Sequence, residues 1–214
     1  MVVFRPTALV WGPPAHKVRV VGRVVVLASG TGTNLAAIIE ACADGRLAAE
    51  VVAVVSDRPD APALDRARDV GIDAIGLALR DGERRGDYDT RLADVVSEYR
   101  PDVVVLAGWM RILTMSFLMR FADQVINLHP ALPGELPGVR AIDRAWEEYI
   151  DSERDHTGVM VHLVPDEGVD DGPVLGTEVV PIPDGESYEV YVARMHAAEH
   201  RVLVAALVEW FASR

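Results

Sequence analysis

The sequence has only one cysteine, Cys42, among its 214 residues. A single thiol cannot close an intramolecular disulfide and cannot supply a cysteine-rich zinc site. Secreted scaffolds that depend on disulfides are therefore excluded, and we expect a reducing, cytoplasmic setting. The 50% hydrophobic content is sufficient for a core that needs no such cross-links.

Basic residues are also few. The chain has 21 Lys and Arg against 33 Asp and Glu, so its formal net charge is -12. Nucleic-acid binding depends on many Lys and Arg contacts to phosphates, so this charge argues against a nucleic-acid partner. A small anionic ligand remains compatible with it, because a few backbone N–H groups and one or two arginines can hold such a ligand locally.

Long apolar runs are missing as well. The densest runs are short, such as VVVLA, whereas a membrane-spanning helix needs about 20 apolar residues. Near the N-terminus, Arg5, Pro6 and Pro13 interrupt the apolar stretch, and no signal-peptide cleavage pattern follows. We therefore expect no membrane association, a poorly ordered extension over residues 1–22 and a single domain over residues 23–214.

From Arg23 onward, short β-branched runs alternate with longer amphipathic segments. This alternation is typical of parallel strands covered by helices and predicts an α/β fold. Cys42 shares one face of the first predicted helix with Leu35 and Ile38, so we expect its thiol in the core. We predict strands at 23–29, 50–56, 74–77, 102–108, 124–129, 156–164 and 174–182, and helices at 34–43, 63–70, 87–99, 139–152 and 188–212.

The turn between the first strand and the first helix reads SGTGTN over residues 29–34. Its glycines let backbone N–H groups converge, and the helix N-terminus adds the positive end of its dipole, so the turn suits a phosphate. Leu35 stands where the dinucleotide fingerprint has a third Gly or Ala, and the GKS or GKT ending of a P-loop is missing. A monophosphate therefore fits better than a dinucleotide or triphosphate, and a tight turn without a ligand is the alternative.

Asn127 and His129 stand two residues apart in the segment INLHP. Side chains two apart in a strand point to the same side, so the amide and the imidazole can meet beyond the strand end. Together they suit the developing oxyanion of an acyl transfer. Each alone would say little, since a lone histidine at a strand end is more often structural.

An acidic turn, DEGVDDGP, follows a strand that carries a further histidine. A carboxylate from this turn can orient or charge His129 and raise the pKa of its imidazole. A solvated loop is the plain alternative. A metal site is another, with donors at His162, Asp166, Glu167 and Asp170. These donors lack a regular ligand spacing, so we expect no metal.

Four segments resemble the glycinamide ribonucleotide formyltransferase family in order and spacing: VVVLASGTGTNLAAIIEA, PDVVVLAGWMRIL, INLHPALPG and HTGVMVHLVPDEGVDDGPV. The similarity runs from about Arg23 to the end of the chain. It implies a Rossmann-like three-layer fold, with a mostly parallel sheet flanked by helices. It also implies formyl transfer from the co-substrate 10-formyltetrahydrofolate to the amine of glycinamide ribonucleotide, which gives N-formylglycinamide ribonucleotide and tetrahydrofolate in de novo purine biosynthesis.

The same resemblance assigns site residues by position. The catalytic residues of the family match Asn127, His129 and Asp170. Its ribonucleotide contacts match Gly32, Thr33, Asn34, His196 and Glu199, the first three through their backbone. Its folate contacts match Arg85, Met110, Arg111, Ile112, Leu113, Asp166 and Glu167.

Three features depart from the usual family pattern. The frequent HPSLLP motif reads HPALPG here, so a serine hydroxyl and a leucine are missing. Pro165 is an insertion in the acidic turn, so Asp170 is aligned through its DxGP ending and Asp166 is the alternative catalytic carboxylate. Arg140 and Ile142 stand where family members often have histidines, which therefore cannot be essential to the activity.

The resemblance implies a mechanism without a covalent enzyme intermediate. The neutral amine attacks the formyl carbon, and Asn127 and a protonated His129 stabilise the tetrahedral oxyanion. Asp170 is expected to keep His129 charged.

Other enzymes that use 10-formyltetrahydrofolate are alternatives. Formyltetrahydrofolate hydrolases usually add an N-terminal regulatory domain, and methionyl-tRNA formyltransferases a C-terminal RNA-binding domain, neither of which is expected here. Sugar-nucleotide formyltransferases are the nearest rival, separated by whether the SGTGTN turn takes a monophosphate. A non-catalytic nucleotide-binding module would leave Asn127, His129 and Asp170 without a purpose. The oligomeric state stays open between a monomer and a homodimer.

Overall fold

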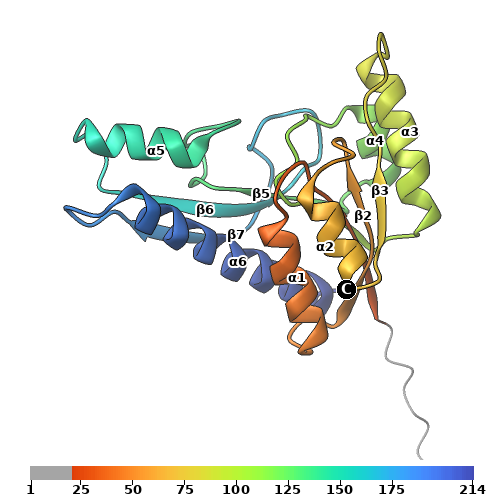
Figure 1. Cartoon of the computed structure of the whole chain (residues 1–214), viewed down its shortest axis with the longest axis horizontal. Helices are drawn as coiled ribbons and strands as arrows, with labels where there is room; N and C mark the ends of the chain where they lie inside the picture. Colours follow the sequence, from red (N-terminus) through yellow and green to blue (C-terminus); the bar gives the residue numbers. More distant parts are fainter. Residues whose placement is uncertain (1–20) are drawn as a thin grey trace, which may run out of the picture.

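The computed structural model describes residues 21–214, so all but the last two residues of the predicted N-terminal extension lie outside the described part. Its centre is a seven-stranded sheet with the strand order β3-β2-β1-β4-β5-β6-β7 (Figure 1). Strands β1 to β5 run parallel, whereas β6 and β7 are antiparallel to their neighbours. The strands are β1 (Gly22–Leu27), β2 (Ala49–Ser56), β3 (Asp73–Gly76), β4 (Val103–Leu106), β5 (Val125–His129), β6 (His156–Leu163) and β7 (Val174–Pro181).

Helices cover both faces of this sheet. One face packs against α1 (Thr33–Ala43), α2 (Pro62–Asp69), α5 (Ala141–Ile150) and α6 (Tyr188–Ala212). The other packs against α3 (Arg85–Glu98), α4 (Met115–Leu118) and the 3-10 turn η1 (Met119–Phe121). The predicted three-layer α/β fold with a mostly parallel sheet is confirmed.

The two central strands, β1 and β4, explain why the sequence shows unbroken apolar runs. Residues 24–27 and 103–105 are fully buried. Because helices cover both faces of the sheet here, side chains on either side of a strand reach a core, and no polar alternation is needed. The edge strand β7 is largely exposed along its length and carries a mixed sequence instead.

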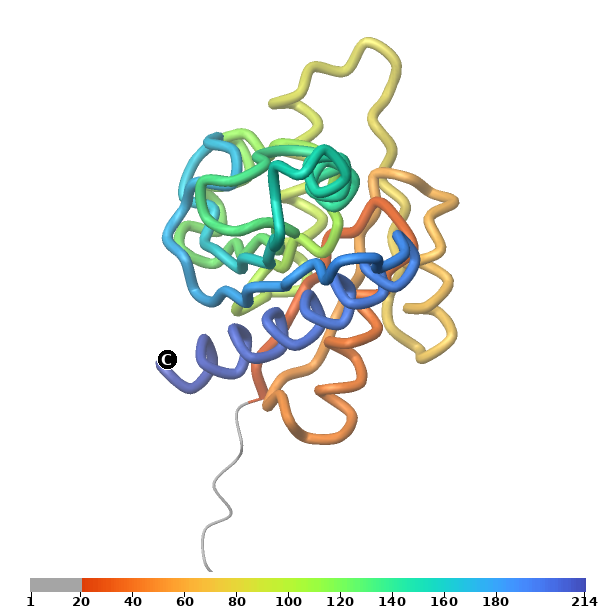
Figure 2. The backbone as a smooth tube through the Cα atoms, turned by 90° about the vertical axis from the view of Figure 1, so that its left-hand side faces the viewer, coloured from red at the N-terminus to blue at the C-terminus, as the bar shows by residue number. Residues whose placement is uncertain are grey.

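The terminal helix α6 runs along β6 and β7 and also packs against α1 (Figures 1 and 2). Its course brings Glu199 beside Asn34, although the two residues are 165 positions apart in the chain. A segment at the end of the domain therefore completes a site that begins at its first helix.

All the predicted strands and helices are present, with ends displaced by a few residues. The prediction that the Cys42 thiol lies in the core is only partly right. The side chain packs against the core but stays partly exposed near the end of α1. Within residues 21–214, no helix combines the length and the apolar character needed to cross a membrane.

The chain reverses its direction of travel across the sheet between β1 and β4. From β1 it moves outward through β2 to β3, and then returns to β4 on the other side of β1. In open α/β sheets, ligands bind beyond the carboxyl ends of the strands at such a switch point. The segments that follow β1, β4 and β5 all lie at this edge and line one cavity.

Candidate active site

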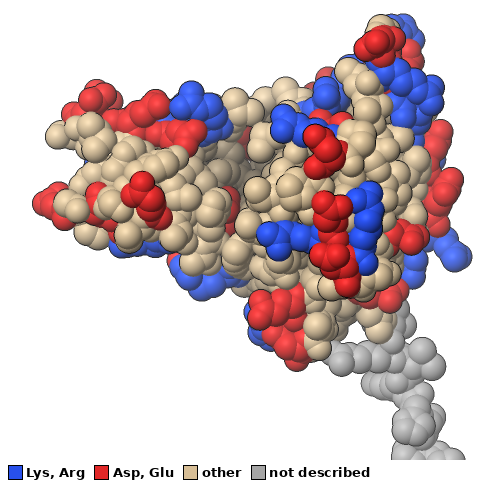
Figure 3. All heavy atoms as spheres, viewed as in Figure 1, with Lys and Arg blue, Asp and Glu red and all other residues tan. Residues whose placement is uncertain are grey.

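A cavity of about 510 Å³ opens at this edge of the sheet. Its walls come from the segments that follow β1, β4 and β5, the acidic turn between β6 and β7, the start of α5, and α6. The space-filling view shows a hollow between the α5 end of the molecule and the half that carries α1 and α2 (Figure 3). Acidic and basic side chains of the described residues intermingle on this face, without a continuous basic area.

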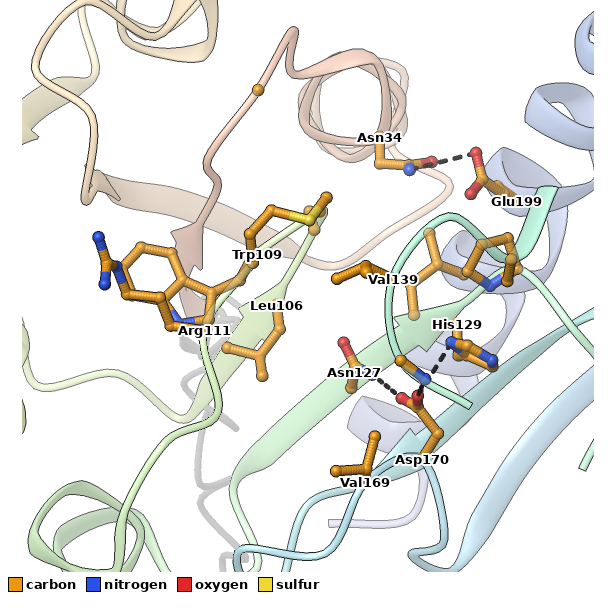
Figure 4. A pocket seen from close by; sticks show the side chains of 18 of the residues that line it. Asn34, Leu106, Trp109, Arg111, Asn127, His129, Val139, Val169, Asp170 and Glu199 are labelled. Carbon is orange, nitrogen blue, oxygen red and sulfur yellow. Dashed lines mark hydrogen bonds and ion pairs between the residues drawn. The ribbon is translucent and has the colours of Figure 1, made fainter. Parts of the chain in front are cut away.

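The three predicted catalytic residues meet on the cavity floor (Figure 4). Asn127 and His129 lie two apart on β5, so their side chains share one face of the sheet. The Asn127 amide donates to Asp170 Oδ1 at 3.0 Å, and His129 Nδ1 lies 3.2 Å from Asp170 Oδ2. The same Oδ2 accepts a 2.8 Å hydrogen bond from the backbone N–H of Gly138.

The two carboxylates considered for catalysis have different surroundings. Asp170 adopts a left-handed backbone conformation, with φ 56, and its carboxylate reaches back to β5. Asp166 lines the cavity, but its Oδ1 accepts from the Gly168 N–H in its own turn at 2.8 Å. The structure therefore brings Asp170 to His129, and Asp166 stays on the rim.

Burial and neighbouring groups shift the pKa values of both His129 and Asp170. Burial lowers the pKa of the His129 imidazole below its usual value, and the Asp170 carboxylate and the backbone of Glu135 and Leu136 offset that shift only in part. Burial also disfavours the charged form of Asp170, but the hydrogen bonds it accepts and the nearby imidazoles outweigh it and lower the pKa of this carboxyl. Asp170 thus favours the charged form of His129, as expected from the sequence, but burial of the imidazole opposes it.

A buried histidine on β6 completes the cluster. His162 Nδ1 lies 2.8 Å from the carbonyl oxygen of Leu163, which can only accept, so Nδ1 donates this hydrogen bond. Its Nε2 then accepts from the Asn127 amide at 3.1 Å. Together with Asp170, His162 uses both amide hydrogens of Asn127. Sequence reasoning considered His162 only as a metal donor, because its place opposite Asn127 depends on the antiparallel register of β5 and β6.

The described residues give no support to that metal alternative. Within residues 21–214, no group of three or more His, Cys, Asp or Glu side chains is placed to hold a metal ion.

The glycine turn forms one end of the cavity, at the start of α1. Gly32 precedes α1 with φ 75, a conformation that glycine adopts readily. A Cβ at this position would lie 2.9 Å from both Cα and Cβ of Ala63, so a side chain would also be crowded. Thr33 and Asn34 of the first turn line the cavity, and N–H groups at a helix N-terminus have no partner within the helix.

Side chains from α6 close the same end of the cavity (Figure 4). Glu199 is buried and accepts from Asn34 Nδ2 at 3.5 Å, and its Oε2 lies 2.7 Å from His196 Nδ1. This contact with Glu199 raises the pKa of the His196 imidazole. The predicted ribonucleotide residues thus come together from two distant segments.

The segment after β4 forms the opposite wall. Met110 and Ile112 expose 57% and 56% of their surface, whereas Leu113 is buried, so the first two side chains are the ones available to a ligand. Arg111 also lines the cavity, but its Nε is held 2.6 Å from Oδ2 of Asp57, a buried residue that sequence reasoning missed.

Two predicted folate residues lie outside the cavity lining. Arg85 flanks the cavity, where its Nη2 donates to the carbonyl oxygen of Ile112 at 2.6 Å and lies 3.2 Å from Asp89. Glu167 accepts from the Met115 N–H at 2.8 Å and so ties the acidic turn to the start of α4. Neither residue faces the ligand space directly in this structure.

Comparisons with known proteins agree with this architecture. The sequence matches the family model of formyl transferases over residues 22–207. It is 40% identical over 189 residues to the phosphoribosylglycinamide formyltransferase of Escherichia coli (strain K12), a match covering 88% of this chain and 86% of that protein. It is 38% identical over 197 residues to the enzyme of that name in Dictyostelium discoideum, covering 86% and 95%. The solved structure of glycinamide ribonucleotide transformylase 1 from Symbiobacterium toebii is similar with a TM-score of 0.83 at 36% identity, covering 90% of this chain and 88% of that one.

Proposed function

The chain belongs to the phosphoribosylglycinamide formyltransferases of the formyl transferase family, and we propose that its two substrates meet above Asn127, His129 and Asp170. It transfers a formyl group in purine biosynthesis. The donor in this proposal is 10-formyltetrahydrofolate, and the acceptor is the amine of glycinamide ribonucleotide. The products are N-formylglycinamide ribonucleotide and tetrahydrofolate.

The two ends of the cavity suit the two substrates. The phosphate of the ribonucleotide binds the backbone N–H groups at Gly32, Thr33 and Asn34, where the helix dipole favours an anion. Glu199 and His196 face the same end and hydrogen-bond the ribonucleotide. The pterin ring of the folate lies along the segment 110–113, and Asp166 reaches it from the acidic turn.

Formyl transfer begins when the neutral amine attacks the formyl carbon and a C–N bond forms. The negative charge that develops on the formyl oxygen accepts a hydrogen bond from the Asn127 amide. In the free site both amide hydrogens are used, so this contact replaces the one to His162, while the bond to Asp170 remains. Hydrogen bonds in a free active site commonly rearrange in this way when substrates bind.

His129 transfers the proton in the same proposal. The buried, neutral imidazole takes the proton released by the attacking amine, and the ionised Asp170 stabilises the imidazolium that forms. The imidazolium also stabilises the oxyanion. It then gives its proton to the leaving N10 as the N10–C bond breaks and the carbonyl re-forms.

The observation that carries this proposal is the contact of a single carboxylate, Asp170, with both Asn127 and His129 between the two ends of the cavity. Purified protein supplied with 10-formyltetrahydrofolate should form tetrahydrofolate only when glycinamide ribonucleotide is present. Equal consumption of the donor without an acceptor would indicate a hydrolase instead. Transfer to a sugar-nucleotide amine with comparable kcat/KM would contradict the assigned acceptor.

A further inference from the structure

The loop between β5 and α5 has a strained backbone. Four of its residues, each two positions apart, have positive φ: Gly134, Leu136, Gly138 and Arg140. At Leu136 (φ 46) and Arg140 (φ 60) the side chain disfavours this conformation. Such residues keep a strained conformation only where surrounding contacts hold it.

Arg144, on the first turn and a half of α5, supplies contacts of this kind. Its Nη2 donates to the carbonyl oxygen of Leu136 at 2.6 Å and to that of Pro137 at 2.7 Å. Because a guanidinium is always charged, both hydrogen bonds are charge-assisted and strong. Its Nε is buried without an acceptor among the described residues, so the two loop carbonyls are the groups that fix this side chain.

The carbonyl of Pro137 belongs to the same peptide unit as the N–H of Gly138. A trans peptide is planar, so its C=O and N–H point in opposite directions. Arg144 holds the oxygen on one side at 2.7 Å, and Asp170 Oδ2 accepts the N–H on the other at 2.8 Å. That Oδ2 is also the oxygen 3.2 Å from His129 Nδ1.

We propose that Arg144 is a positioning residue, which acts on the carboxylate of Asp170 through the Pro137–Gly138 peptide. Its cation fixes the direction of this peptide and polarises it, which strengthens the hydrogen bond from the Gly138 N–H to Asp170. The proposal rests on the proposed function, in which Asp170 supports proton transfer by His129.

The conformation of Gly138 shows what the loss of Arg144 would change. With φ 82 after a proline, Gly138 has the positive φ that the third position of a type II turn requires. The alternative type I turn has the central peptide rotated and a negative φ at this position. In that arrangement the N–H points away from Asp170, and the carboxylate loses one of the contacts that hold it on His129.

The test compares Arg144→Met, which keeps most of the volume and removes the charge, with Arg144→Lys, which keeps the charge. We expect kcat to fall roughly 10- to 100-fold in the methionine variant, because small displacements of catalytic groups cost that much. The KM for each substrate should change little. Arg144→Lys should recover part of the loss. As a matched control, Arg201→Met removes an α6 arginine that pairs with Glu178 away from the cavity, and it should behave as the unaltered enzyme.

The pH dependence separates positioning from a merely structural role. Loss of the Gly138 hydrogen bond loosens the contact of the Asp170 carboxylate with His129, which supports the charged imidazole, so the pKa of His129 should fall and the acid limb of kcat/KM should move to lower pH in Arg144→Met. Unchanged kcat, or a lower kcat with an unmoved acid limb, would overturn the proposal. Asp170→Asn, measured in parallel, distinguishes a failure of the proposed function from a failure of the role assigned to Arg144. Full turnover in that variant would refute the proposed function, whereas an impaired Asp170→Asn beside an unaffected Arg144→Met would refute only the role of Arg144.

Discussion

The glycine turn at residues 30–34 and the carboxyl end of β5 both line one cavity, and they present different chemistry to it. The turn offers backbone N–H groups at a helix N-terminus, which carry no titratable charge. The end of β5 offers an amide and an imidazole held by a carboxylate, whose protonation states matter. A backbone site should be sensitive to shape, whereas a side-chain site should be sensitive to charge and pH.

The largest expected effect lies on the β5 side. Asn127→Ala removes the amide proposed to stabilise the oxyanion, and kcat should fall by about 10²- to 10³-fold. The KM for glycinamide ribonucleotide should stay nearly constant, since this contact forms in the transition state. Steady-state kinetics with both substrates varied would check this, and a variant affected mainly in KM would place Asn127 among the binding residues.

Gly32→Val tests the backbone side. The substitution places a branched side chain at φ 75 and 2.9 Å from Ala63, so the turn must shift and its N–H groups lose their alignment on the phosphate. We expect the affinity for glycinamide ribonucleotide to fall at least about 10-fold, while the affinity for the folate stays close to unchanged. Separate calorimetric titrations with each ligand would show this.

Gly45→Val is the matched control for that substitution. Gly45 also has positive φ, at 80, but a side chain there meets open space. The control therefore reports the cost of the backbone conformation alone, and it should leave both affinities intact. Equal weakening of both ligands in Gly32→Val would mean that the two substrates are placed wrongly.

The pH sensitivity of the β5 side can be measured directly on the free protein. Burial lowers the pKa of His129, and the Asp170 carboxylate opposes that shift, so Asp170→Asn should lower this pKa further. In an NMR titration of the imidazole signals, His129 should therefore titrate below the usual histidine value of about 6.5, and lower still in the variant. A pKa above that value, falling in the variant, would instead support the charged His129 of the sequence-based mechanism.

The smallest expected effect lies at the rim of the backbone side. Glu199 raises the pKa of His196, so the imidazole is protonated over a wider pH range and gives a weak attraction to the nucleotide, lost as pH rises through that pKa. The His196 side chain is 42% exposed, which screens the interaction. His196→Gln should weaken glycinamide ribonucleotide binding by roughly five-fold or less at low pH, and its affinity should vary less with pH.

The same contrast explains which parts could be predicted from the sequence. Local sequence patterns were enough to predict the glycine turn, because a strand, a glycine-rich turn and a helix follow one another in the chain. They were also enough to predict that Asn127 and His129 lie together, because side chains two residues apart in a strand share one face of the sheet. The sheet layers followed from the alternation of apolar runs and amphipathic segments.

Contacts between distant segments could not be predicted in this way. The hydrogen bond of His162 to Asn127 depends on the register of β5 and β6. The ion pair of Asp57 with Arg111 depends on how two loops meet across the sheet edge. The hydrogen bond that Glu167 accepts from a backbone N–H at the start of α4 joins two segments far apart in the chain. In each case the partner is set by tertiary packing, of which the local sequence carries no signal.

The most direct test of the account compares Asp170→Asn with Asp166→Asn in single-turnover formyl transfer at saturating substrates. Asp170 contacts both Asn127 and His129, whereas the Oδ1 of Asp166 is bonded within its own turn. The account predicts that Asp170→Asn slows the chemical step by at least about 10²-fold, a loss comparable to that of an oxyanion donor, and that Asp166→Asn acts mainly on folate affinity. A chemical step slowed more by Asp166→Asn than by Asp170→Asn would contradict it.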